Sequence, residues 1–150
     1  MPSMRALSAL FAGVFLAILT VLSPPLTHAA DQKLGKIFIK PAASDVGGQQ
    51  FSDPELDAAV KDLKGYPDKF VLAEKESEAD FLLIVIERKA MAVSGQPASK
   101  VLVATLSVRD GAAWKPAAKL ESGVGTTIWR AAAEQIIKKA EKWVKENGGK

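Results

Sequence analysis

The sequence contains no cysteine and only one histidine, His28, among its 150 residues. A disulfide framework, a thiolate nucleophile, a zinc finger and an iron–sulfur cluster are excluded, because each of them needs sulfur. One histidine cannot build a histidine-based metal site alone. The 20 basic and 17 acidic residues give a net charge of only +3, spread along the chain rather than clustered in a basic stripe. We therefore expect no nucleic-acid partner.

Charged residues are also missing from positions 6–22, an apolar run that follows the single charge of Arg5. This order is typical of a secretory signal peptide. The small-x-small pattern that ends at Ala29 predicts cleavage after Ala29, with cleavage after Ala30 as the alternative. An uncleaved anchor helix is the other interpretation, but 17 apolar residues are marginal against the ~20 that span a bilayer. We predict a cleaved signal at 1–29, one domain at 30–150, and a periplasmic or secreted protein without a stable membrane anchor.

Cleavage would also remove Arg5 and His28, which leaves 19 basic and 17 acidic side chains in the mature chain. The mature protein would then lack both histidine and cysteine. Ser-His-Asp and Cys-His catalysis and histidine-ligated metals are excluded for such a chain. We therefore predict no catalytic residues, no cofactor and no metal centre, and a protein that binds instead of catalysing.

Hydrophobic patterning predicts the element order β-α-β-β-β-β-α. Strands are expected at 36–40, 69–73, 81–86, 100–109 and 112–121, and helices from Pro54 to Gly65 and from Thr126 or Thr127 to Asn147. Residues 42–50 are interpreted as a loop and residues 93–99 as a turn. The uninterrupted apolar run at 81–86 is typical of a central strand. Pro116 indicates that the last strand lies at a sheet edge, since proline cannot donate to a ladder.

The two helices have distinct start signals. Ser52 and Glu55 have the spacing of a capping box, which predicts an N-cap at Ser52. A threonine N-cap is expected for the last helix. Trp129 and Trp143 share one face of that helix, where core packing is expected and an aromatic groove is the alternative.

This order predicts an α+β fold: one βαβ unit, then an antiparallel meander and a helix, with the helices packed on a mixed sheet. A right-handed crossover places the first helix on one face. The last helix could lie beside it or on the opposite face. Since about 120 residues rarely fill three layers, we predict a two-layer sandwich.

Three segments carry a resemblance to a known family: residues 70–73, residues 78–85 with their Ala-Asp entry into a hydrophobic strand, and residues 106–111 with Trp114 following. Together they resemble the small α/β module at the amino terminus of TolB and in related envelope proteins, such as the curli-secretion and penicillin-binding-protein-activator lipoproteins. The resemblance covers about residues 36–145. It implies a protein that works in the cell envelope by contacting other proteins, although this chain has no cysteine for lipidation and no propeller sequence follows.

A possible partner-binding surface is predicted at Trp114, Lys115 and Pro116, near a hairpin tip on the predicted edge strand. Edge strands recruit partner strands, and exposed aromatic residues anchor interfaces. We therefore predict a small non-enzymatic accessory protein that binds another envelope protein.

A possible weak cation site is predicted where acidic residues fall at every second position, at Glu74, Glu76, Glu78 and Asp80. If this segment is extended, the four carboxylates project from one face and could gather a hard cation. A solvated charged connection is the other interpretation. The alternative function is accordingly a carboxylate-based hydrolase, or a cation- or small-ligand-binding protein of the envelope.

Overall fold

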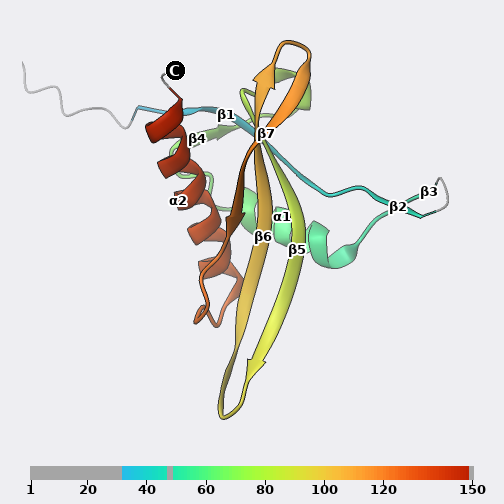
Figure 1. Cartoon of the computed structure of the whole chain (residues 1–150), viewed down its shortest axis with the longest axis vertical. Helices are drawn as coiled ribbons and strands as arrows, with labels where there is room; N and C mark the ends of the chain where they lie inside the picture. The colour runs from blue at the N-terminus through green and yellow to red at the C-terminus, as the bar shows by residue number, and fades with distance from the viewer. Residues whose placement is uncertain (1–31, 47–48, 149–150) are drawn as a thin grey trace, which may run out of the picture. The chain divides into compact units, whose positions relative to one another are not determined.

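The computed structural model describes residues 32–46 and 49–148, and the predicted signal at 1–29 lies outside these residues (Figure 1). The main sheet has the strand order β4-β1-β5-β6-β7. Its strands are β1 (Gly35–Pro41), β4 (Phe70–Leu72), β5 (Phe81–Val93), β6 (Gln96–Asp110) and β7 (Ala113–Glu121). β1 runs parallel to β4 and β5, and β5, β6 and β7 form an antiparallel meander. The predicted central position of residues 81–86 and the edge position of the last strand are confirmed.

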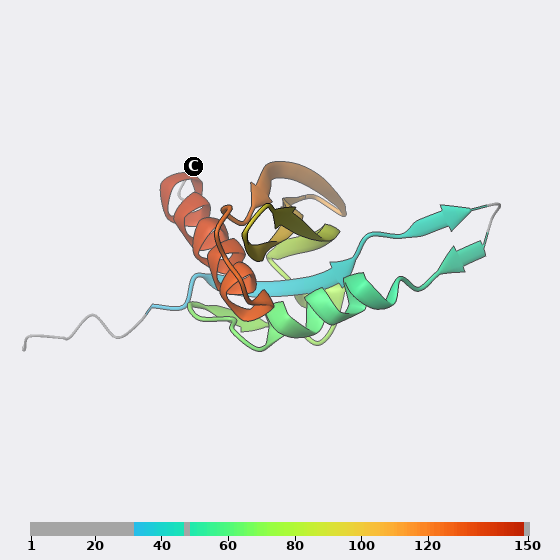
Figure 2. The same ribbon diagram turned by 90° about the horizontal axis from the view of Figure 1, so that it is seen from below.

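Two helices cover one face of this sheet (Figure 2). α1 (Pro54–Lys64) packs on β1 and β5, α2 (Trp129–Asn147) packs on β6 and β7, and the helices contact each other. The predicted two-layer α+β sandwich is therefore confirmed, with the last helix beside the first. Neither of these helices is both long and apolar enough to cross a bilayer.

The hydrophobic core lies between the helices and this face of the sheet, and its buried members in the described residues run from Ile37 to Val144. Alternate strand residues point into it, among them Ile37, Ile39, Leu83, Val85, Leu102, Ala104 and Leu106. Trp129 and Trp143 are partly buried against the same core, as predicted.

The opposite face of the sheet, called here the helix-free face, carries the residues that alternate with the core set. Phe38, Leu82 and Ser107 are neighbours across three strands of this face. Leu82 is nevertheless 1% exposed. The segment between β4 and β5 reaches β1, where Ala73 and Asp80 donate backbone hydrogen bonds to Ile37 and Lys36.

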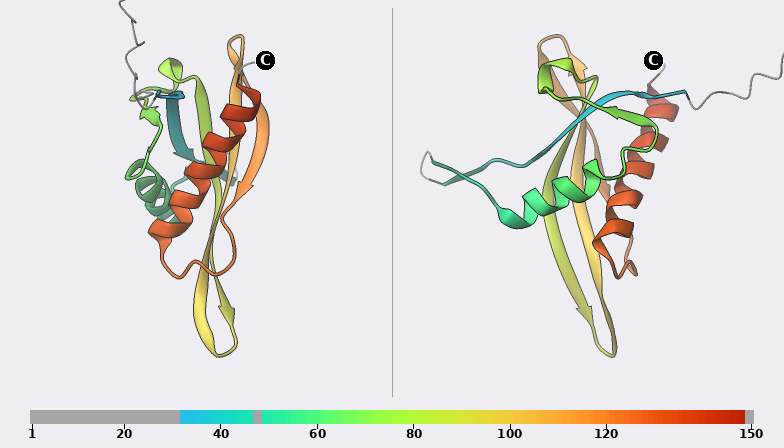
Figure 3. Two further views of the ribbon diagram at one scale, coloured as in Figure 1. Left: turned by 90° about the vertical axis from the view of Figure 1, so that its left-hand side faces the viewer. Right: turned by 180° about the vertical axis from the view of Figure 1, so that it is seen from behind.

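Two segments predicted to be irregular are strands instead. Residues 42–50, predicted as a loop, contribute β2 (Ser44–Val46), and with β3 (Gln49–Phe51) they form a separate antiparallel ribbon. Residues 93–99, predicted as a turn, belong mostly to β6. β5 and β6 continue to a turn at Ser94 and Gly95, where Gly95 adopts φ +76°, and this hairpin projects beyond the helices (Figure 3). Hydrophobic patterning did not predict these strand ends, because many residues along the hairpin are small or polar.

The predicted start of α1 at Pro54 is confirmed, but its predicted cap and the predicted cap of α2 are wrong. Asp53, not Ser52, is the N-cap of α1, and its carboxylate accepts a hydrogen bond from the Glu55 backbone. The Ser52 hydroxyl bonds to the Asp57 carboxylate. α2 begins after Ile128, without a side-chain cap. Thr126, one of the predicted caps, donates its hydroxyl to the Lys100 carbonyl at 2.7 Å and so attaches the preceding loop to β6.

Candidate functional site

Glu76 joins the two sites that the sequence predicts separately. It begins η1 (Glu76–Glu78), a 3-10 turn in the connection between β4 and β5. Its Oε1 accepts a hydrogen bond from Trp114 Nε1 at 2.8 Å, and its Oε2 lies 2.7 Å from Lys40 Nζ. One residue of the acidic segment therefore holds the aromatic residue of the predicted partner-binding surface.

Arg109 completes this cluster from β6. Its Nη2 donates to the Glu76 carbonyl at 2.8 Å, and its Nε donates to the Ala79 carbonyl at 3.2 Å. Its guanidinium also lies 4.2 Å from the centre of the Trp114 ring, a stacked cation–π arrangement. The indole of Trp114 is thus held at its nitrogen and on one face.

The electrostatics of the cluster favour an ionised Glu76. Its pKa is lowered, first by the hydrogen bond from Lys40, with further contributions from the charge of Lys40, the Trp114 bond and the charge of Arg109. Burial opposes these effects. Because the side chains of Lys40 and Glu76 are 37% and 35% exposed, water screens the ion pair, which contributes orientation more than stability.

The surface predicted at Trp114, Lys115 and Pro116 lies on β7, one of the two edge strands of the sheet. Lys115 and Pro116 are exposed and Trp114 is half-buried. Within the described part of the chain, β7 pairs only with β6. The register shifts where Ser107 pairs with Pro116, which leaves Ala117 as the extra residue of a bulge.

The predicted cation site is not assembled. The segment is not extended, as that site would require, because the 3-10 turn η1 takes Glu76 and Glu78 out of line with Glu74. The Asp80 carboxylate accepts the backbone N–H of Lys36 at 2.8 Å and so attaches the start of β5 to β1. In residues 32–46 and 49–148, no three acidic side chains lie close enough together to hold a metal ion.

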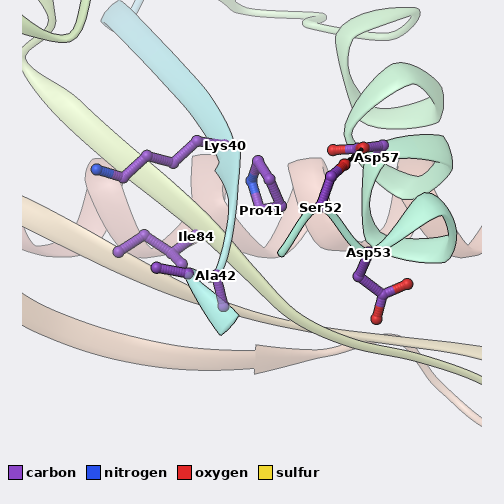
Figure 4. Close-up of a pocket in the computed structure, with 8 residues that line it drawn as sticks. Lys40, Pro41, Ala42, Ser52, Asp53, Asp57 and Ile84 are labelled. Atoms are coloured by element: carbon purple, nitrogen blue, oxygen red, sulfur yellow. Dashed lines mark hydrogen bonds between the residues drawn. The ribbon is translucent and has the colours of Figure 1, made fainter. Parts of the chain in front are cut away.

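A notch of about 600 Å³ lies between the end of β1 and the start of α1 (Figure 4). Its apolar lining includes Pro41, Ala42 and Ile84, and its polar lining includes Ser52, Asp53 and Asp57. These three polar side chains serve the start of α1. The notch is therefore explained by the helix cap and the strand that leaves the sheet.

Sequence reasoning missed Lys40 and Arg109. The position of Arg109 had a signal, since a two-residue loop at Gly111 and Ala112 places Arg109 directly opposite Trp114. Gly111 has φ +62°, which suits glycine at the first position of such a loop. The pairing of Lys40 with Glu76 had no comparable signal, because these residues are 36 positions apart.

Comparisons with models of protein families, with characterised proteins and with solved structures give no match. The resemblance to the TolB amino-terminal module therefore stays a prediction, and function is inferred from the residues and contacts described above.

Proposed function

We propose that this chain is a small non-enzymatic accessory protein, periplasmic or secreted, which binds another envelope protein through Trp114, Lys115 and Pro116. The observation that carries the proposal is the fixed indole of Trp114 on an edge strand. Glu76 holds the indole nitrogen and Arg109 stacks on the ring. An anchor held in one orientation loses little conformational entropy when a partner binds, which favours affinity.

The edge of β7 favours docking through side chains over the addition of a partner strand. Pro116 lacks a backbone donor, and the bulge at Ala117 interrupts the regular edge. Lys119 is exposed on the same face of β7 as Trp114, whereas Lys115 is exposed on the opposite face. We therefore propose a partner that covers Trp114, presents an acidic group to Lys119 and reaches Lys115 around the open edge of β7.

The proposed location rests on the apolar run at 6–22 and the cleavage pattern at Ala29. The intact mass of the protein recovered from the periplasm or medium tests it. A chain that begins at Ala30 supports the proposal, and a full-length chain in the membrane fraction contradicts it.

The binding proposal is tested by photo-crosslinking in living cells. A photoreactive amino acid replaces Lys115, and the matched control replaces Lys142, whose side chain is 76% exposed on α2. We expect one discrete adduct from position 115 that disappears when Trp114→Ala is added. Equal adducts from both positions, or an adduct that survives Trp114→Ala, would contradict the proposal.

A further inference from the structure

Exposed apolar side chains gather at one end of the described domain, called here the distal end. It comprises residues 86–100 of the β5–β6 hairpin together with the loop and helix start at 123–129. Of the five large apolar side chains that are exposed in the described residues, four lie here: Ile86, Met91, Val124 and Ile128. The two parts are joined, since Gly125 donates to the Ser99 hydroxyl at 3.1 Å and Lys100 donates to the Thr126 carbonyl at 2.6 Å.

The charges of the distal end are mostly of one sign. Residues 88–109 contain no acidic residue, and residues 90–99, which form the tip, contain no charge at all. Directly behind this uncharged tip stand Arg88, Lys89 and Lys100. Lys89 is the partner of Glu87 at 3.2 Å.

Two of these cations lie close to the ring of Trp129. The Arg88 guanidinium is 4.0 Å and the Lys100 ammonium 5.3 Å from the centre of its ring. Arg88 also lies 3.4 Å from Asp62, and its Nε is buried without a hydrogen-bond partner in the described residues. Aromatic, apolar and cationic side chains are thus combined at one end, with few acids to balance them.

The tip exposes apolar groups on both faces of the hairpin. Met91 pairs with Ser99 on the helix-free face and is 43% exposed, whereas Ala90 pairs with Lys100 on the other face and is also exposed. A flat protein surface covers one face of a hairpin. A lipid interface, in contrast, surrounds a tip that enters end-on. Figures 1 and 3 show that this hairpin extends past the helices, so its tip is free to enter in this way.

We propose that the distal end docks reversibly on a membrane surface that carries anionic phospholipid. The uncharged tip enters the interfacial zone, where headgroups and water can still hydrogen-bond the open edge of β5. Lys89 and Lys100 stand about 15 Å behind the turn at the rise of an extended chain. Their long side chains reach the phosphate level from there, and each cation near an anionic surface strengthens partition about fivefold.

The test measures partition of the chain from Ala30 onward onto vesicles of 30% phosphatidylglycerol in phosphatidylcholine, and onto phosphatidylcholine alone. We expect binding to the anionic vesicles, and at least a tenfold loss for Met91→Asp and for Val124→Asp. Val71→Asp is the matched control, because Val71 is 41% exposed on β4 and the change in charge is the same. The double variant with Lys89→Gln and Lys100→Gln should weaken binding about 25-fold, because each lysine strengthens partition about fivefold.

Position 92 supplies a second readout, since the chain has no native cysteine to compete for a label. A polarity-sensitive dye on Ala92→Cys should shift to the blue with anionic vesicles, whereas the same dye on Ser77→Cys should not. Absence of binding to anionic vesicles, an equal loss for Val71→Asp, or an unshifted dye at position 92 overturns the proposal. Capture of an envelope protein at position 92 by a chain that ignores vesicles overturns the lipid assignment.

Discussion

Replacing Trp114 by phenylalanine tests whether Glu76 fixes the proposed binding surface. The variant keeps an aromatic ring beside Arg109 but removes the N–H that donates to Glu76 at 2.8 Å. A hydrogen bond to a charged group contributes about 1.5–3 kcal/mol, and water replaces part of that here because Glu76 is 35% exposed. We therefore expect the free energy of unfolding to fall by about 1 kcal/mol at pH 7.

The same loss should fade in acid. The pKa of Glu76 is lowered in the folded protein, chiefly by Lys40 and also by Trp114. A lowered pKa contributes stability above the ordinary carboxyl value of 4.5, and this stability disappears as the pH falls through the folded-state pKa. Once Glu76 is protonated, Trp114 no longer donates to a charged acceptor in the wild type. The free energies of unfolding of the wild type and the variant should then differ less.

Urea unfolding followed by far-ultraviolet circular dichroism, at pH 7 and at the lowest pH where both proteins fold, measures the two differences. Trp143→Phe on α2 is the control, and its effect should not follow the titration of Glu76. A double-mutant cycle with Glu76→Gln should give a coupling of about 1 kcal/mol at pH 7. An unchanged stability of Trp114→Phe at pH 7, or an equal loss in acid, would refute the reasoning.

Three further predictions concern the core and the acidic residues. The pKa of buried Glu141 is raised, first by burial and then by the charge of Asp68, although a backbone N–H opposes the rise. Ionisation of Glu141 thus costs stability as the pH rises, so Glu141→Gln should stabilise by about 1 kcal/mol at pH 8 and have no effect near pH 4; an equal gain at both would contradict this cause. Calcium at millimolar concentration should leave the melting temperature unchanged, because residues 74–80 are curled and partly committed to other partners; a clear rise would restore the cation site. Leu106→Ala should cost about 3 kcal/mol in urea unfolding, since Leu106 is 0% exposed in the core, and a loss below 1 kcal/mol would mean that the core collapses around the cavity.

The layers of the fold were predictable because they follow from patterns that are local in sequence. The apolar stripe of α2, the continuous run at 81–86 and the proline at 116 each report the environment of their own segment. Their sum gives two helices on a mixed sheet. The β5–β6 tip had no such signal, because its small and polar residues pack against little else.

The contacts of the candidate site were less predictable, because they join residues distant in the chain. Trp114 and Glu76 are 38 positions apart. They meet only because the connection after β4 reaches the helix-free face and curls into η1 before β5 begins. The alternate spacing of the acidic residues suggested an extended segment with its carboxylates on one face. The backbone instead forms the 3-10 turn η1, and the Glu76 carboxylate accepts a hydrogen bond from the Trp114 indole.

The length of β6 has a mechanical consequence. Its 15 residues span about 50 Å, with one hairpin turn at each end, and it is paired with β5 on one side and β7 on the other. Tension applied between the two turns runs along the covalent backbone of β6, which is already extended, and the strands paired on either side keep it straight. If the protein is held at both ends of β6, the distance between the two turns should therefore change little under tension.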